Sequence, residues 1–148
     1  MKRVMNAVFY GLILALLALV VEAKKKDDNP NAPPKRLKIE TTYTPPSCNR
    51  KARKSKTGDR LKVNYSGTFW KDQDTIIDSN HKSRKPYEFN VGLGNVIAGW
   101  DRGLTKMCVG EKRVLTIPAH QTNQAEPLVY SVELVGIDTA PAVKSTKK

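Results

Sequence analysis

The polar side chains of this 148-residue chain match none of the familiar catalytic patterns. The sequence holds no Gly-x-Ser-x-Gly nucleophile turn, no His-Glu-x-x-His zinc motif and no glycine-rich phosphate loop. Its two histidines, His81 and His120, lie in polar stretches typical of exposed loops. Asp72, Asp74 and Asp78 are close in sequence but lack the glycine and distal glutamate of a calcium loop, which favours a solvated hairpin. We therefore expect no metal site and no cofactor.

Aromatic residues are the other group that could support chemistry. Tyr65, Tyr87, Phe89 and Tyr130 lie in stretches with strand-like alternation, and Trp100 lies in a stretch with helical spacing. Such residues can line an apolar, water-poor pocket, but aromatic side chains on a sheet are more often plain core. Periodicity alone favours the core and leaves both interpretations open.

The elements that must position these residues are mostly strands. Alternating or β-branched stretches predict six of them, at 36–44, 60–70, 76–79, 87–92, 113–118 and 128–137. The first of these is expected to be half-buried. Apolar residues three to four apart predict a single helix over 97–107, which is short and contains two glycines. The expected fold class is α+β, an antiparallel sheet of five to six strands with one short helix packed on a face.

Both ends of the chain are expected to lie outside this domain. Residues 1–23 have a basic start and an apolar run, which predicts a secretory signal peptide cut after Ala23. A membrane anchor is the alternative, but the apolar run is short for a bilayer span. Residues 24–34 predict a disordered polar tail, 35–138 the domain and 139–148 a basic tail. Signal cleavage would leave no membrane anchor and place the chain in an oxidising compartment.

Basic residues give the chain a formal net charge of +12, which on its own suggests a nucleic-acid or membrane partner. The charge is unevenly distributed, because residues 24–57 carry a net +8 whereas residues 58–138 carry ten charges of each sign. The prospective domain core is therefore neutral, and we expect no nucleic-acid partner.

Four fragments carry a specific family resemblance. They read GDRLKVNYSGTF (58–69), IIDSN (76–80), KPYEFNVGLGNVIAGWDRGLTKMCVGEKRVLTIP (85–118) and LVYSVELVGI (128–137). Together they closely resemble the FKBP-type peptidyl-prolyl isomerases, and in detail the small secretory, endoplasmic-reticulum branch. The resemblance implies a sheet wrapped around a short helix. It also implies a monomer in the endoplasmic reticulum lumen or secreted from the cell. Its partners would be proline-containing peptides and unfolded client proteins.

The resemblance also assigns roles to individual residues. The residues that it places at the pocket are Tyr65, Asp78, Tyr87, Phe89, Val96, Ile97, Trp100 and Tyr130. Trp100 would form the floor under the proline ring, with Tyr87, Phe89 and Tyr130 as walls and Val96 beside it at the edge. The Ile97 N–H would donate a hydrogen bond to a substrate carbonyl. Asp78 and the Tyr65 hydroxyl would orient the amide, and no general base would be needed.

The chain departs from the family pattern at two places. Ile77 stands where the family usually has an aromatic residue before the pocket aspartate, so that wall is apolar but smaller. Residues 119–127 (AHQTNQAEP) replace a loop about ten residues longer, which in the family supplies a pocket tyrosine. A loop over a site orients substrate and excludes water. We therefore expect reduced isomerase activity and weak macrolide affinity.

Two further motifs have competing interpretations. Cys48 and Cys108 match the cysteine pair of the secretory branch, and an oxidising compartment favours a disulfide over two buried thiols. Asn64 begins an Asn-Tyr-Ser glycosylation sequon, but it lies inside a predicted strand, which favours an unmodified residue.

Three functions compete at this point. The first is a secretory-pathway isomerase acting on X-Pro bonds of folding clients. The second is an FKBP-like binding or chaperone module that has lost turnover with its loop. The third is binding of acidic polymers through the basic run at 50–56 (RKARKSK), for which a solvated loop is the simpler account.

Overall fold

The computed structural model describes residues 32–139. The predicted signal peptide, most of the polar tail and nearly all of the basic tail lie outside this range. None of the helices within it is long and apolar enough to cross a membrane. The strands are β1 (Lys38–Tyr43), β2 (Arg60–Phe69), β3 (Ile76–Ser79), β4 (Tyr87–Asn90), β5 (Lys112–Ile117) and β6 (Leu128–Asp138). The helices are α2 (Ala98–Gly103) and the single 3₁₀ turns η1 (His81–Ser83) and η2 (Ala119–Gln121).

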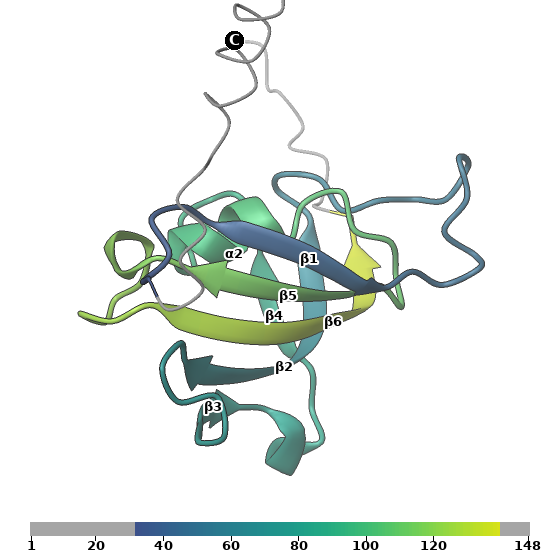
Figure 1. Ribbon diagram of the computed structural model, residues 1–148. Coiled ribbons are helices and arrows are strands. Elements are labelled where there is room, and N and C mark those ends of the chain that lie inside the picture. Colours follow the sequence, from purple (N-terminus) through teal and green to yellow (C-terminus); the bar gives the residue numbers. More distant parts are fainter. Residues whose placement is uncertain (1–31, 140–148) are drawn as a thin grey trace, which may run out of the picture. The chain divides into compact units, whose positions relative to one another are not determined.

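The six strands form one antiparallel sheet in the order β1-β5-β6-β2-β3, with β4 also paired to β2 (Figure 1). One edge of strand β2 pairs with two different strands. Its first four residues pair with β4, and residues 66–68 pair with β3. Its other edge pairs with β6 along its whole length. The α+β fold class expected from the sequence is confirmed.

Alternation along β2 and β6 separates a buried face from an outer face, as the sequence predicts. Leu128, Tyr130, Val132 and Leu134 are buried, and the residues between them are partly or fully exposed. The buried apolar residues form one core cluster made of Leu61, Val63, Phe89, Val91, Trp100, Leu104, Met107, Leu115, Ile117, Leu128, Tyr130, Val132 and Leu134. Their burial at roughly 25 cal/mol per Å² of apolar surface is the main stabilising contribution.

Strand β1 is the point where the expectation of a half-buried strand is wrong. All six of its residues are exposed, including Ile39 at 45% and Tyr43 at 48%. The alternation is real, but β1 is an edge strand that pairs only with β5, and none of its residues belongs to the core cluster or packs against it. Leu37, just before the strand, is the residue that packs against the core.

Helix α2 is shorter than the predicted 97–107, since it runs only from Ala98 to Gly103. Two glycines let the helix approach β5 closely. A Cβ atom at Gly99 would lie 2.6 Å from Ile117, and one at Gly103 would lie 2.7 Å from Leu115. Leu104 and Met107 remain fully buried although they follow the helix, so the 3–4 spacing extends beyond it.

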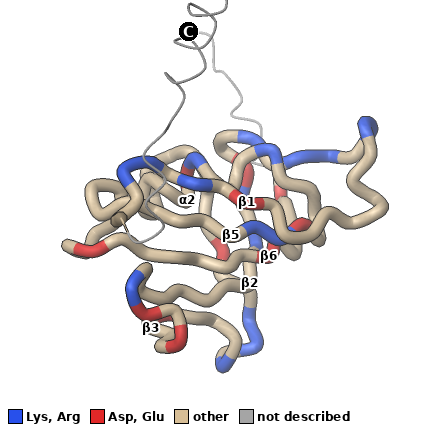
Figure 2. Tube along the Cα trace, in the orientation of Figure 1, with Lys and Arg blue, Asp and Glu red and all other residues tan. Residues whose placement is uncertain are grey.

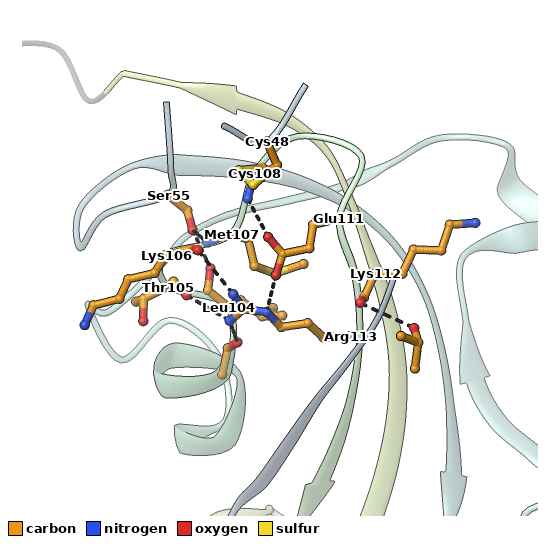
Figure 3. Close-up of polar contacts among 12 residues, drawn as sticks. Cys48, Ser55, Leu104, Thr105, Lys106, Met107, Cys108, Glu111, Lys112 and Arg113 are labelled. Atoms are coloured by element: carbon orange, nitrogen blue, oxygen red, sulfur yellow. Dashed lines mark hydrogen bonds and ion pairs between the residues drawn. A yellow bond between two sulfur atoms is a disulfide. The ribbon is translucent and has the colours of Figure 1, made fainter. Parts of the chain in front are cut away.

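A buried polar cluster replaces the missing turns at the end of α2 (Figure 3). Arg113 Nη1 donates to the carbonyls of Gly103 and Thr105 at 2.7 and 2.9 Å. Ser55, which is 1% exposed, donates from Oγ to the Leu104 carbonyl and accepts from the Met107 N–H. These bonds satisfy backbone groups that a helix end leaves unpaired.

Cys48 and Cys108 form a disulfide with a Cα–Cα distance of 5.6 Å, which rules out the alternative of two free thiols. The bond ties the β1–β2 connection to the turn after α2. Glu111 lies beside it, accepting from the Cys108 N–H at 2.9 Å and from Arg113 Nε at 2.7 Å. The donor atoms of Cys48, Cys108 and Glu111 gather within 4.8 Å, but metal-binding cysteines are thiolates and these sulfurs are bonded to each other.

The β1–β2 connection projects from the sheet and carries the basic run of residues 50–56, here called the basic arm (Figure 2). Arg53 pairs with Asp59 at 3.0 Å, and Ser55 anchors the arm to the turn after α2. Arg50, Lys51 and the other two lysines of the arm are exposed. The arm is therefore a solvated loop on a fixed base.

Candidate functional site

A cavity of about 280 Å³ opens on the helix-bearing side of β2. Its lining residues come from strands β2, β3 and β4, from α2 and the turn before it, and from the connection between β5 and β6. They are Tyr65, Asp78, Tyr87, Asn95, Val96, Ile97, Trp100 and Asn123.

Trp100 lies at the centre of the aromatic residues around this cavity. Its ring centroid is 5.0 Å from that of Tyr65 and 5.2 Å from that of Tyr130, both in edge-on geometry. Phe89 is 5.5 Å away and Tyr87 6.2 Å. Edge-to-face pairs at these distances are favourable beyond the area they bury. Trp100 is 4% exposed and its Nε1 has no hydrogen-bond partner among the described residues, so its ring is held by packing alone.

Six of the nine pocket residues expected from the sequence line the cavity: Tyr65, Asp78, Tyr87, Val96, Ile97 and Trp100. Phe89 and Tyr130 do not; they are 6% and 8% exposed, contact Trp100 ring to ring and are members of the core cluster. Ile77 lies beside Asp78 on β3 and is 37% exposed, also outside the lining. Phe89 and Tyr130 therefore belong to the core, while Trp100 belongs to the core and to the cavity.

Tyr65 and Asp78 are joined across the cavity wall. The Tyr65 hydroxyl donates to Asp78 Oδ1 at 3.0 Å. Burial, and then the hydrogen bond to Asp78, raise the pKa of Tyr65 to about 12. Burial, followed by the charge of Asp78, also raises the pKa of Tyr130. The Tyr65 hydroxyl therefore remains a donor throughout the physiological pH range.

Asn80 fixes the backbone of β2 where the strand changes partners. Its Oδ1 accepts from the Tyr65 N–H at 2.8 Å, and its Nδ2 donates to the Val63 carbonyl at 2.9 Å. The amide side chain thus pairs the two backbone groups that lie between the β4 and β3 ladders, and holds Tyr65 in place.

Asp101 fixes the turn that leads into the cavity edge. Its two carboxylate oxygens accept from the N–H groups of Gly92 and Gly94 at 2.8 and 2.7 Å. The N–H of Ile97 has no acceptor among residues 32–139, whereas the Ile97 carbonyl accepts from Trp100 at 2.9 Å. A free backbone donor at a cavity edge is suited to a ligand carbonyl.

Sequence reasoning missed Asn95, Asn123 and Asp101. Asn95 adjoins Val96 and could have been inferred from that neighbour. Asn123 gives no local signal, because packing sets the course of the ten-residue connection from β5 to β6. Asp101 follows Trp100 directly, and only the fold shows that its carboxylate reaches back to Gly92. His81 and His120 are exposed on η1 and η2, as expected for loop residues.

Comparisons with known proteins agree on one family. The model of the FKBP-type peptidyl-prolyl cis-trans isomerases matches residues 51–135. An Arabidopsis thaliana relative, peptidyl-prolyl cis-trans isomerase FKBP15-1, is 36% identical, with 97% of this chain and 94% of the relative covered. FK506-binding protein 2 of Dictyostelium discoideum is 38% identical, with 86% and 93% covered.

A solved structure shows the same fold. The crystal structure of AtFKBP13 aligns with a TM-score of 0.60 over 72% of this chain and 97% of that one, at 23% sequence identity. The family model matches more than half of the sequence, and the Arabidopsis thaliana relative covers nearly all of it. This chain therefore belongs to the FKBP-type peptidyl-prolyl cis-trans isomerases.

Proposed function

We propose that the cavity over Trp100 is the site at which this chain isomerises X-Pro bonds of client proteins in the secretory pathway. The observation that carries the proposal is the combination of a buried indole floor, two tyrosine walls and a free Ile97 N–H in one cavity. A proline ring fits an aromatic floor, and a peptide carbonyl fits a backbone donor.

The chemistry needs neither a nucleophile nor a base. Rotation about an amide has a barrier of ~18–20 kcal/mol because twisting removes the double-bond character of the C–N bond. The twisted amide is less dipolar than the planar one, so an apolar and water-poor site lowers the barrier. Trp100 and Tyr87 supply the apolar surface. The Ile97 N–H, the Tyr65 hydroxyl and Asp78 would orient the peptide and require no proton transfer.

The short connection between β5 and β6 favours a reduced rate. Residues 119–127 contain η2 and contribute a single residue, Asn123, to the cavity lining. Since a longer covering loop would exclude water and hold the peptide, we propose weaker turnover and weak macrolide binding. The same observation supports the alternative function, a binding or chaperone module with little or no turnover.

The proposed compartment is the endoplasmic reticulum lumen or the extracellular space. Three observations support it: the signal-like residues 1–23, the Cys48–Cys108 disulfide and relatives named FK506-binding protein 2. We also propose that residues 35–138 act as a monomeric domain with no cofactor.

A matched pair of tyrosine variants tests the site. Tyr87 and Tyr43 are similarly exposed, at 43% and 48%, but only Tyr87 lines the cavity. We expect Tyr87→Leu to lower kcat/KM for cis-to-trans conversion of an X-Pro peptide about tenfold, or ~1.4 kcal/mol of transition-state binding, and Tyr43→Leu to leave it unchanged. Equal effects of the two changes would refute this placement of the site.

A second measurement separates the isomerase from the binding module. Peptide affinity is read from Trp fluorescence and turnover from the isomerisation rate of the same peptide. Binding with no turnover selects the binding module, and turnover at the rate of full-loop family members refutes the role given to residues 119–127.

A further inference from the structure

The loop from β3 to β4 connects two residues of the cavity wall. Asp78 is near the end of β3 and Tyr87 begins β4, and both line the cavity. Three of the residues between them are cationic, namely Lys82, Arg84 and Lys85, here called the basic rim. The loop that carries the basic rim therefore begins and ends at the cavity wall.

Hydrogen bonds hold the loop in one shape. Asn80 bonds to the backbone of Val63 and Tyr65, and its Nδ2 also donates to the Lys85 carbonyl at 3.0 Å. Ser83 Oγ donates to the Asn80 carbonyl at 2.8 Å and accepts from the Lys85 N–H at 3.3 Å. The base of the basic rim is therefore anchored to Tyr65, itself a cavity residue.

The charges of the basic rim are not neutralised within the described residues. All three side chains are exposed, and none takes part in an ion pair in the described part of the chain. The neighbouring acid Glu88 pairs with Arg60 at 2.9 Å. Figure 2 shows the lysine and arginine positions on this loop.

Acidic groups near the cavity offset only part of this charge. Asp78 accepts the Tyr65 hydroxyl inside the cavity. Asp72 and Asp74 lie in the turn before β3, at the opposite end of that strand from the basic rim. The cavity thus has a net positive flank on the side of η1.

We propose that the basic rim selects X-Pro substrates with Asp or Glu residues next to the proline-containing segment. The proposal rests on isomerase activity at this cavity and names the class of substrate that it favours. Each acidic side chain within several ångströms of the rim gains Coulomb energy that falls off over a Debye length of about 8–10 Å. The preference should therefore be strong at low salt and weak at high salt.

The experiment compares the full-length mature chain on three peptides with the same X-Pro centre. The peptides carry two Glu, two Gln or two Lys residues, placed on either the N-terminal or the C-terminal side. We expect the kcat/KM ratio of the Glu to the Gln peptide to be about 3 to 10 for one of the two placements at 20 mM salt, and to approach one at 0.5 M salt. The Lys peptide is expected to be slower than the Gln peptide.

Two variants of equal charge locate the effect. Lys82→Gln/Arg84→Gln/Lys85→Gln is expected to bring the Glu-to-Gln ratio to about one. Arg50→Gln/Lys51→Gln/Lys54→Gln removes the same charge from the basic arm and is expected to keep the ratio. Circular dichroism confirms that both variants fold.

The outcomes distinguish this proposal from the proposed function. Turnover of all peptides with a ratio of one, or an equal loss in both variants, overturns the charge selection and leaves the isomerase intact. If no peptide is turned over, the isomerase proposal fails, and the same comparison is made with peptide affinities. Equal affinities for Glu and Gln peptides then overturn the selection as well.

Discussion

Single residues in this molecule serve the core and the cavity together. The ring of Trp100 contacts four other aromatic rings, those of Tyr65, Tyr87, Phe89 and Tyr130, and it also lines the cavity. Replacing it would disturb folding and binding together, so it is a poor probe of function. Asp101, which holds the cavity backbone through two hydrogen bonds and lies outside the core cluster, is a milder probe.

The carboxylate of Asp101 offers the first prediction. Asp101→Asn keeps the shape but leaves one acceptor oxygen for two N–H groups, so one of Gly92 and Gly94 loses a partner. We expect a loss of about 1–2 kcal/mol in the free energy of unfolding and a several-fold lower kcat/KM. Urea denaturation and the isomerase assay measure the two effects.

Asp72→Asn is the control for removing a carboxylate charge elsewhere in the fold. Asp72 also accepts from two backbone N–H groups, those of Asp74 and Thr75, but both donate to one oxygen, Oδ1, in an exposed turn outside the cavity lining. This variant is expected to keep its kcat/KM. A similar activity loss in both variants would contradict the positioning role of Asp101.

The hydroxyl of Tyr65 offers the second prediction. The pKa of Tyr65 is raised from 10.0 to about 12, so the folded state holds this proton more tightly than the unfolded chain. The resulting stability is fully present below pH 10 and is lost as the pH rises from about 10 to 12. Denaturant unfolding at a series of pH values, with tyrosinate absorbance at 295 nm, measures the loss. Tyr65→Phe should decline less over this range than Tyr43→Phe, and equal declines would contradict the prediction.

Short elements are placed by contacts that lie outside them. Helix α2 has only six residues, and an isolated helix of that length is unstable in water. It persists because Gly99 and Gly103 let it contact β5, and because Arg113 and Ser55 bind the carbonyls at its end. The β1–β2 connection and the turn after α2 are linked twice, through Ser55 and through the disulfide.

The disulfide offers a prediction at the scale of these elements. Cys48 and Cys108 are 60 positions apart, and closing a loop of that size stabilises by ~4 kcal/mol on the chain-entropy model. Cys48→Ser/Cys108→Ser should lose most of this free energy of unfolding in a urea titration. Because Ser55 and Arg113 still hold the end of α2, we expect kcat/KM at 25 °C to change less than about twofold.

Reduction of the native protein provides the control. A reductant should lower the urea midpoint of the native chain toward that of the double variant, and it should leave the variant unchanged. A native midpoint that reductant does not move would contradict the stabilising role. A thiol reagent should label the native chain only after reduction.

Most of the molecule's excess positive charge lies outside residues 58–138, which contribute the charged and aromatic lining of the cavity. Residues 58–138 carry ten charges of each sign, and the excess lies in the flanking segments and the basic arm. The cavity lining contains one charged residue, Asp78. The total charge therefore bears on solubility and long-range attraction, and only the basic rim carries the charge selection that we propose.

A truncation tests whether the folded part suffices. Among the described residues, all members of the core cluster, and the hydrophobic residues packed on it, lie between Leu37 and Ile137. A chain of residues 33–139 is therefore expected to unfold cooperatively within about 2 °C of the mature protein's Tm, equivalent to well under 1 kcal/mol. Its kcat/KM should be unchanged. Loss of the cooperative transition would show that the ends contribute to the domain.

Local pattern determined much of the fold from the sequence. Alternation in β2 and β6 follows from one buried face and one outer face, so it predicts those strands nearly to the residue. The family fragments likewise indicate the aromatic residues of the site. The alternation in β1 does not indicate that this strand lies at the edge of the sheet. It therefore predicts a half-buried strand, whereas all six residues are exposed.

Tertiary structure decided what depends on contacts between distant segments. The end of α2 is set by Arg113 and Ser55, which lie 10 and 49 positions from the carbonyls they bind. The cavity edge depends on Asp101 reaching Gly92, and its lining includes Asn123 only because the β5–β6 connection passes there. Periodicity reports which side of an element is buried, since it is a property of neighbouring residues. The partner that buries it, and the polar groups that meet across the fold, follow from packing in three dimensions.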